Sequence, residues 1–251
     1  MKQPLLYESD LSQLKDWDEY LLNHSNLPGP RANLELAYAV AKMGEKPLFL
    51  RYLNINAIQA PQNSSAEFLP VCGTLGLGLL LVRGDLSVLP LLHGLASDPR
   101  WRIREGVVLA LELWGESNLN LLFDQMDQWM EGNFFEIRAA ICALSHPKFL
   151  KSKRSAFQVL KYLDDIMQKL QAGKVRKTED FRVLRLAMGY CWSVAVAASP
   201  LQGKGMMQKW IHTTDRDLLW IIKSNLSKNR IFRMDANWVR RMKELIEIES
   251  E

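Results

Sequence analysis

The sequence predicts an all-α protein, a right-handed α-solenoid of five or six stacked antiparallel helix pairs. Apolar residues recur at helical spacing along the chain, without the period-two alternation of strands. A short pattern of aromatic, any residue, isoleucine and base also recurs, at Trp101–Arg104, Phe135–Arg138 and Trp220–Lys223. The first two copies are 34 residues apart, a spacing typical of stacked helical repeats. We therefore expect one domain over residues 1–251.

The first helices of this architecture are expected at Arg31–Val40 and Phe68–Leu79, two apolar segments rich in alanine and glycine. The second segment contains GTLGLG, Gly73–Gly78, whose glycines lack the order and the preceding strand of a dinucleotide-binding loop. We expect these glycines to let helices pack closely instead.

The clearest helix pair is Leu86–Glu116. One face of its second helix carries five apolar residues at helical spacing, namely Ile103, Val107, Ala110, Leu111 and Trp114. Asp98 and Pro99 stand between the two helices. Their positions predict an N-cap and the first helical residue, where the missing N–H of proline costs nothing.

Leu86–Glu116 resembles a HEAT repeat, with leucines along the first helix, an Asp-Pro turn and a hydrophobe-Arg-Glu start to the second helix. The units at Phe135 and Trp220 match that pattern in part. More narrowly, Ser97–Trp101 and Asp215–Ile231 are similar to segments of the HEAT-like DNA alkylation repair proteins. This resemblance implies an armadillo-type superhelix whose concave face holds duplex DNA. The glycosylases of that family carry adjacent tryptophans followed by acids, and this chain has no Trp-Trp pair, so no catalytic aspartate is carried over.

Charge is unevenly distributed along the chain. Residues 1–147 contain 11 Lys and Arg against 17 Asp and Glu, whereas residues 148–251 contain 21 against 11. An excess of basic residues in one half indicates an anionic partner, usually a nucleic acid, although solvated lysines are the commoner explanation for any single cluster.

Seven residues are candidates for contact with nucleic acid: Trp101, Arg104, Arg138, Arg185, Trp192, Lys223 and Arg230. Equivalent positions of successive repeats fall along one surface, so the bases are expected to follow a phosphate backbone. Alternatives stay open for several of them. Arg104 with Asp98 also fits a structural ladder between repeats, and Trp101 either packs on the preceding helices or stands in the groove.

The helix expected around residues 181–192 carries one mixed stripe, Phe181, Arg185, Met188 and Trp192. Such a stripe is a core face in most proteins, with the arginine reaching water at its end. Alternatively, it forms a groove wall in which Arg185 meets phosphate and Trp192 supports it.

Three functions remain open from the sequence. We expect a non-catalytic protein that binds nucleic acid, in particular duplex DNA, through a basic concave surface. A protein-binding scaffold is the alternative, and a glycosylase-like enzyme of DNA alkylation repair is the second alternative, for which no catalytic constellation is found.

No cofactor, metal or membrane partner is expected. The four histidines are scattered without a second ligand at helical spacing, namely His24, His93, His146 and His212. The three cysteines stand alone in apolar helical patterns, which is typical of a reducing compartment, and the first residues lack the apolar stretch of a signal peptide. We expect the cytoplasm.

Overall fold

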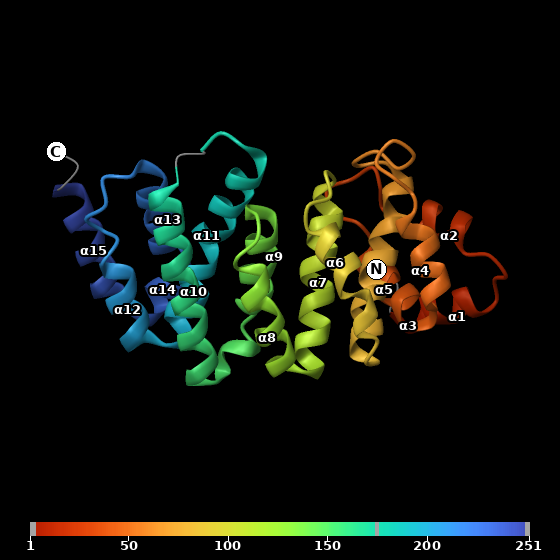
Figure 1. The fold of residues 1–251 in the computed structure, drawn as a ribbon, viewed down its shortest axis with the longest axis horizontal. Helices are drawn as coiled ribbons and strands as arrows, with labels where there is room; N and C mark the ends of the chain where they lie inside the picture. The colour runs from red at the N-terminus through yellow and green to blue at the C-terminus, as the bar shows by residue number, and fades with distance from the viewer. Residues whose placement is uncertain (1–3, 174–175, 249–251) are drawn as a thin grey trace. The chain divides into compact units, whose positions relative to one another are not determined.

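The structure, a computed structural model, describes residues 4–173 and 176–248. All regular elements in these two ranges are helices, which confirms the all-α prediction (Figure 1). The described chain divides between Leu122 and Phe123 into two compact units, here called unit 1 and unit 2. The expected single domain stays a prediction.

Unit 1 contains seven α-helices and two short 3-10 helices: α1 (Pro4–Ser12), α2 (Asp18–Asn23), α3 (Leu34–Met43), α4 (Lys46–Leu53), η1 (Ser65–Glu67), α5 (Phe68–Val82), η2 (Leu86–Val88), α6 (Leu89–Leu95) and α7 (Trp101–Ser117). α8 (Leu119–Trp129) contains the division between the units. Unit 2 continues with α9 (Phe134–Leu144), η3 (Phe149–Lys151), α10 (Lys153–Ala172), α11 (Glu179–Ala198), α12 (Pro200–Gln208), α13 (Arg216–Leu226), α14 (Asn229–Met234) and α15 (Ala236–Ile248).

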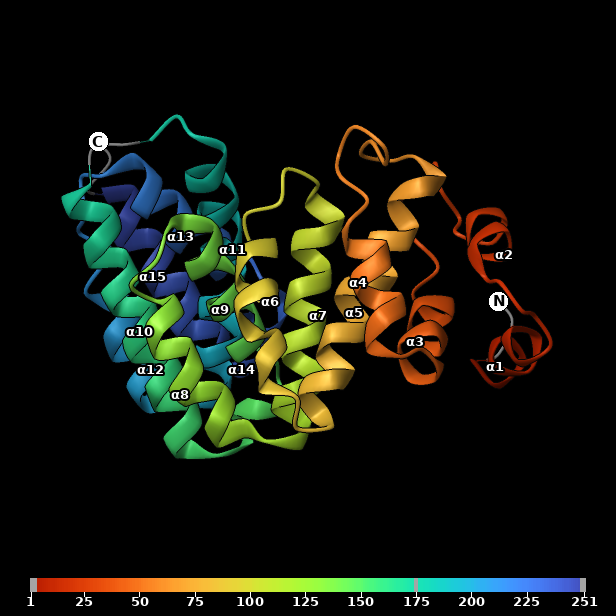
Figure 2. The same cartoon turned by 45° about the vertical axis from the view of Figure 1, so that its right-hand side comes forward.

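α5 is the central helix of unit 1, because almost its whole surface is buried against α3, α4 and α7. Figure 2 shows α3, α4 and α5 side by side. A Cβ atom on Gly76 would lie 2.4 Å from the ring of Phe49 on α4, and one on Gly78 would lie 2.6 Å from the Cα of Ala110 on α7. The GTLGLG segment therefore serves close helix packing, as predicted.

In unit 1, α5 and α7, the second helices of two successive helix pairs, run parallel. Thr74 of α5 faces Gly106 of α7, and one turn later Gly78 faces Ala110. Contacts that advance together along both helices require the same direction and a fixed register.

Unit 2 has the same parallel arrangement around α11. Phe134 and Phe181, at the starts of α9 and α11, pack edge to face with centroids 6.2 Å apart. Along α11 and α13, a contact of Arg185 with Asp217 is followed by one of Ser193 with Asn225. Within unit 2, α9, α11 and α13 therefore run in one direction.

Side chains of α13 enter the hydrogen-bond ladder of α11. The backbone N–H of Ser193 donates to Asn225 Oδ1 at 2.8 Å, and the carbonyl of Gly189 accepts from Ser224 Oγ at 3.0 Å. These two backbone groups are i, i−4 partners in an α-helix, so Ser224 and Asn225 contact the same turn of α11. Asn225 also donates to the carbonyl of Met188 at 2.8 Å and is completely buried.

In each copy of the aromatic-x-Ile-basic pattern the isoleucine lies in the core, but the copies do not lie at the same place along their helices. Its three isoleucines, Ile103, Ile137 and Ile222, are all buried. The first two copies stand at the starts of α7 and α9, whereas the third lies in the middle of α13.

The predicted N-cap role of Asp98 is wrong. α7 begins at Trp101, and Arg100 occupies its N-cap position. Asp98 Oδ1 accepts the backbone N–H of Arg100 at 2.8 Å, and the carboxylate also binds the guanidinium of Arg100 at 2.8 and 2.9 Å. The arginine thus holds the aspartate in a turn before the helix, and Pro99 lies in that turn.

Candidate nucleic-acid interface

The three arginines of the DPRWRIREG segment, Arg100, Arg102 and Arg104, are buried. Arg100 pairs with Asp98 and donates to the carbonyl of Ile55 at 3.1 Å. These contacts tie the start of α7 to the loop that follows α4.

Arg102 forms a buried ion pair with Glu67, with 3.1 Å between Nη1 and Oε2. Its side chain is 5% exposed and that of Glu67 is 0% exposed. Arg102 Nη2 donates to the carbonyl of Gly29 and, at 3.1 Å, to Asn63 Oδ1. The guanidinium thus joins three segments that are distant in sequence.

Arg104 does not lie on a surface that could meet phosphate, which corrects that candidate role. Its Nη1 donates to the carbonyl oxygens of Asp98 at 2.7 Å and Pro99 at 3.0 Å. The alternative structural interpretation fits better, because these bonds go to the backbone of the turn that contains Asp98.

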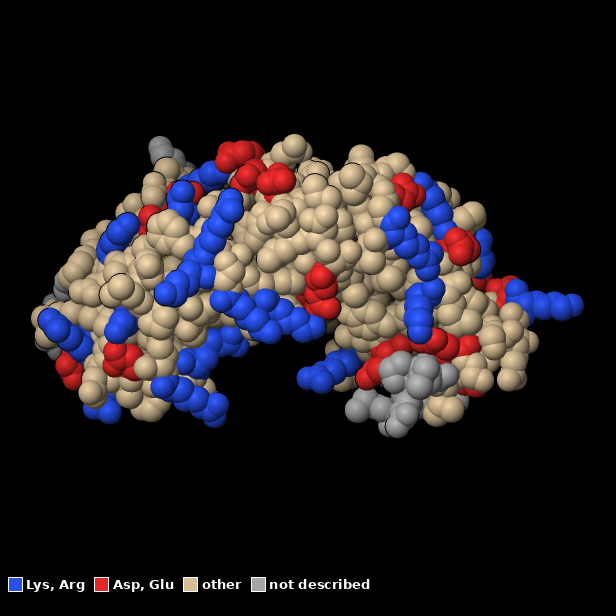
Figure 3. Space-filling model, turned by 90° about the horizontal axis from the view of Figure 1, so that it is seen from below, with Lys and Arg blue, Asp and Glu red and all other residues tan. Residues whose placement is uncertain are grey.

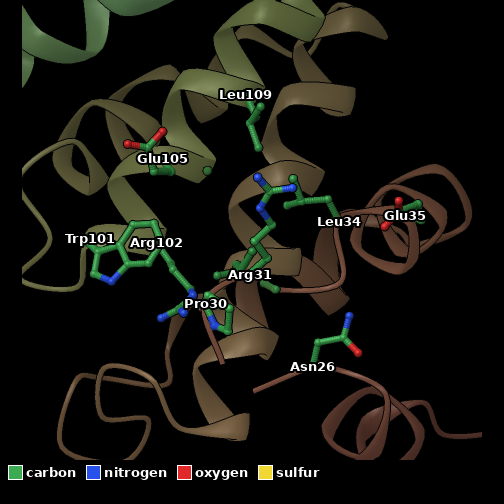
Figure 4. Close-up of a pocket in the computed structure, with 12 residues that line it drawn as sticks. Asn26, Pro30, Arg31, Leu34, Glu35, Trp101, Arg102, Glu105 and Leu109 are labelled. Atoms are coloured by element: carbon green, nitrogen blue, oxygen red, sulfur yellow. The ribbon is translucent and has the colours of Figure 1, made fainter. Parts of the chain in front are cut away.

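Trp101 is the exposed member of this segment, at 39%, so it does not pack into the core. The Arg102 guanidinium lies 4.4 Å from its ring centroid. Trp101 stands at a pocket of about 570 Å³ in unit 1 (Figure 4). The pocket is lined by Asn26, Pro30, Arg31, Ala32, Leu34, Glu35, Val71, Trp101, Arg102, Glu105, Gly106 and Leu109. Its walls are mainly apolar, with both signs of charge present.

Trp192 is completely buried, so its predicted place in a groove wall is wrong. Phe181 and Met188 of the same stripe are also buried, which makes this face of α11 core. Arg185, at the edge of the stripe, reaches the surface and pairs with Asp217 of α13 at 2.7 Å.

A cationic–aromatic surface lies on α11, α13 and α14, and we define it as Arg185, Tyr190, Trp220, Lys223 and Arg230. The guanidinium of Arg185 lies 3.8 Å from the ring centroid of Trp220, and that of Arg230 lies 4.6 Å from the ring centroid of Tyr190. Arg230 also donates to the Tyr190 hydroxyl.

Gly189 allows close packing between α11 and Trp220 of this surface. A Cβ atom there would lie 2.9 Å from the ring of Trp220, so the absence of a side chain lets Trp220 lie directly on α11. Gly189 stands one turn after Arg185 and next to Tyr190 in the sequence of α11. Lys223 is exposed one turn after Trp220 on α13.

Arg138 lies elsewhere in unit 2. It is half-buried on α9, and its charge acts on the Cys191 thiol of α11. Of the five predicted basic residues, Arg185 and Arg230 thus stack on aromatic rings and Lys223 is exposed on α13, whereas Arg104 is buried in unit 1 and Arg138 lies on α9.

The basic excess belongs to unit 2. This unit has 22 Lys and Arg against 15 Asp and Glu, and unit 1 has 10 against 13. Figure 3 shows Lys and Arg side chains over the part of the molecule that α10–α15 occupy in Figure 1. Within the described ranges, neither Lys223 nor Arg230 has an acidic partner, whereas Asp217 neutralises Arg185.

Sequence reasoning missed Tyr190 and Trp220 as parts of this surface, and Arg31 as part of the pocket. A signal for Tyr190 exists, because it follows Leu186 by one helical turn and both are about half exposed on an otherwise apolar helix. Each arginine stacks on a ring from another helix, so no local sequence pattern predicts the contact.

No family model matches the chain, and no curated protein or solved structure shows significant similarity to it. Within the described ranges, no group of His, Cys, Asp and Glu residues could hold a metal ion. Two segments, Ser65–Val82 and Glu179–Ala198, have the length and hydropathy of a membrane span, and more than half of each is buried inside the structure.

Proposed function

We propose that the chain is a HEAT-like α-solenoid that binds nucleic acid, in particular duplex DNA, without catalysing a reaction on it. The parallel registers of α5 with α7 and of α9, α11 and α13 support a solenoid, because stacked helix pairs place their second helices in this way.

The cationic–aromatic surface carries the functional proposal. Lys223 and Arg230 present charge without an acidic partner among the described residues, and stacking on Tyr190 restricts the guanidinium of Arg230 before any ligand arrives. Phosphate oxygens accept hydrogen bonds from such groups, and the aromatic support reduces the entropy lost on binding. Contacts of this kind position a nucleic acid without reading its sequence.

The test is a titration of fluorescently labelled duplex DNA, single-stranded DNA and RNA at several salt concentrations. For duplex DNA, the double variant Lys223→Ala/Arg230→Ala should weaken binding equally for unrelated sequences. Each lost phosphate contact should flatten the logarithmic salt slope by about 0.9. The control Lys15→Ala/Lys42→Ala removes the same two positive charges from exposed positions of unit 1, of which Lys42 pairs with Glu8 at 2.8 Å, and should leave the slope near that of the wild type.

Equal slopes for the two double variants would contradict the assignment of the surface. Failure of the wild-type protein to retain any nucleic acid at low salt would contradict the function itself.

Trp101 tests a separate contact of the same proposal. If its exposed ring meets the nucleic acid, Trp101→Ala should lower the affinity and leave the salt slope unchanged, because stacking and apolar contact release no counterions.

A protein-binding scaffold is the second candidate, and the pocket beside Trp101 favours it. The lining of this pocket is mainly apolar and also contains Arg31 and Glu35. It therefore suits a protein segment that inserts an apolar side chain and places polar groups beside it. This candidate is retained if no nucleic acid binds.

A further inference from the structure

Cys142 of α9 and Cys191 of α11 are neighbours where these two helices pack on each other inside unit 2. The rings of Phe134 and Phe181 pack at the starts of the same two parallel helices. Cys142 follows Phe134 by eight residues and Cys191 follows Phe181 by ten, so each lies about 12–15 Å further along its helix. The meeting of the thiols therefore follows from the register of α9 and α11.

The two thiols differ in access. Cys191 is 1% exposed, whereas Cys142 is half-buried. Buried alanines stand on both sides of Cys142, at Ala139 and Ala143, which lets the helices approach closely. A small oxidant from solvent reaches Cys142 first.

Local electrostatics disfavour ionisation of the Cys191 thiol. The neighbouring Cys142 thiol and burial raise the pKa of Cys191 well above its ordinary value, while Ser145 and the charge of Arg138 act in the opposite direction. Arg138 stands one turn before Cys142 on α9. A thiol that resists ionisation is a poor first nucleophile, because the thiolate is the reactive form. Cys191 is therefore not the thiol that peroxide oxidises first.

We propose that Cys142 and Cys191 form a redox-active dithiol site that closes to an intramolecular disulfide when hydrogen peroxide oxidises it. The sulfur of Cys142 takes one oxygen atom from the peroxide, which gives a sulfenic acid and one water. The sulfur of Cys191 then attacks the sulfenic sulfur. The S–S bond forms, and the hydroxyl group leaves with the thiol proton as a second water. Two thiols are oxidised and one peroxide is reduced to two waters.

The test counts thiols in the full chain. The reduced protein is treated with hydrogen peroxide, denatured, alkylated with iodoacetamide and weighed by mass spectrometry. We expect the wild type to lose two of its three alkylation sites together with two hydrogen atoms, and dithiothreitol to restore both sites. Peptide mapping should place the bond between Cys142 and Cys191 and leave Cys72 alkylated.

Cys72 provides the matched control, because it is completely buried in unit 1. Cys72→Ala should form the disulfide as the wild type does, and Cys142→Ser and Cys191→Ser should not form it. Oxidation should also raise the urea midpoint of the wild type, because the bond closes a long loop of the unfolded chain.

Three results would overturn the proposal. They are three alkylatable thiols remaining after peroxide treatment, oxygen addition at Cys142 that dithiothreitol does not reverse, and a disulfide that joins two chains. The dithiothreitol result is measured on the wild type alone, so it does not depend on how the variants fold.

Discussion

The buried pair of Arg102 and Glu67 gives the sharpest prediction for stability. Arg102→Met replaces the guanidinium by an apolar side chain and leaves the Glu67 carboxylate in the interior, where the backbone N–H of Asn63 donates to it at 2.7 Å. Removing one partner of a buried ion pair costs about 3–5 kcal/mol, because the other charge remains desolvated.

The magnitude is large for a protein of this size. Free energies of unfolding are typically about 5–15 kcal/mol, so the substitution should remove a substantial fraction of the stability. Glu67→Gln keeps an acceptor for Asn63 and Arg102, and its cost should be smaller, about 1.5–3 kcal/mol. The double variant Arg102→Met/Glu67→Leu leaves neither charge behind and should cost less than the sum of Arg102→Met and Glu67→Leu.

Urea unfolding followed by far-UV circular dichroism measures these differences. Lys15→Met is the control, because Lys15 is exposed and should change the free energy of unfolding by no more than about 0.5 kcal/mol. The reasoning is refuted if Arg102→Met and Lys15→Met unfold at the same urea concentration, or if the double variant costs the full sum of the two single ones.

Further predictions concern packing, pH and the turn before α7. Gly78→Ala should lower the free energy of unfolding in urea by about 1–3 kcal/mol, because its Cβ would lie 2.6 Å from the backbone of α7, whereas Gly94→Ala, with open space around it, should not. The backbone N–H groups at the start of α15 and a neighbouring lysine lower the pKa of Asp235 in the folded protein. The stabilisation by this carboxylate is therefore complete above the pKa that Asp235 has in the unfolded chain, and it is lost as the pH falls through the lower pKa of the folded protein. Thermal unfolding across acidic pH should show a weaker decline for Asp235→Asn. Asp98→Ala should cost more than the loss of an N-cap, about 3–5 kcal/mol, because it leaves Arg100 buried without its carboxylate, and a melting temperature equal to that of the wild type would contradict this.

Local periodicity was sufficient to predict the helical class and the places of several helices. The apolar face of α7 is buried as expected, and α3 and α5 occupy nearly the segments expected for them. The start of α7 was misplaced because an Asp-Pro turn and an N-cap have the same sequence signature. What distinguishes them is the guanidinium of Arg100, which binds the carboxylate of Asp98 and depends on carbonyl groups elsewhere for its other bonds.

The candidate site was less predictable, because it depends on partners distant in sequence. Arg102 gives no local sign that Glu67 lies beside it, 35 residues away. Likewise Arg230 and Tyr190 are 40 residues apart. The sequence shows which residues are basic, but only the fold determines whether a basic side chain faces solvent, an acidic residue or an aromatic ring.

The insertion of α13 into α11 has a consequence for how unit 2 assembles. The backbone N–H of Ser193 on α11 donates to the side chain of Asn225 on α13, so the hydrogen bonding of α11 depends in part on α13. Formation of the two helices is thereby coupled, and solvent exchange of the Ser193 amide proton reports the docking of α13 as well as the opening of α11. The surface formed by Tyr190 and Trp220 then exists only while the two helices remain joined.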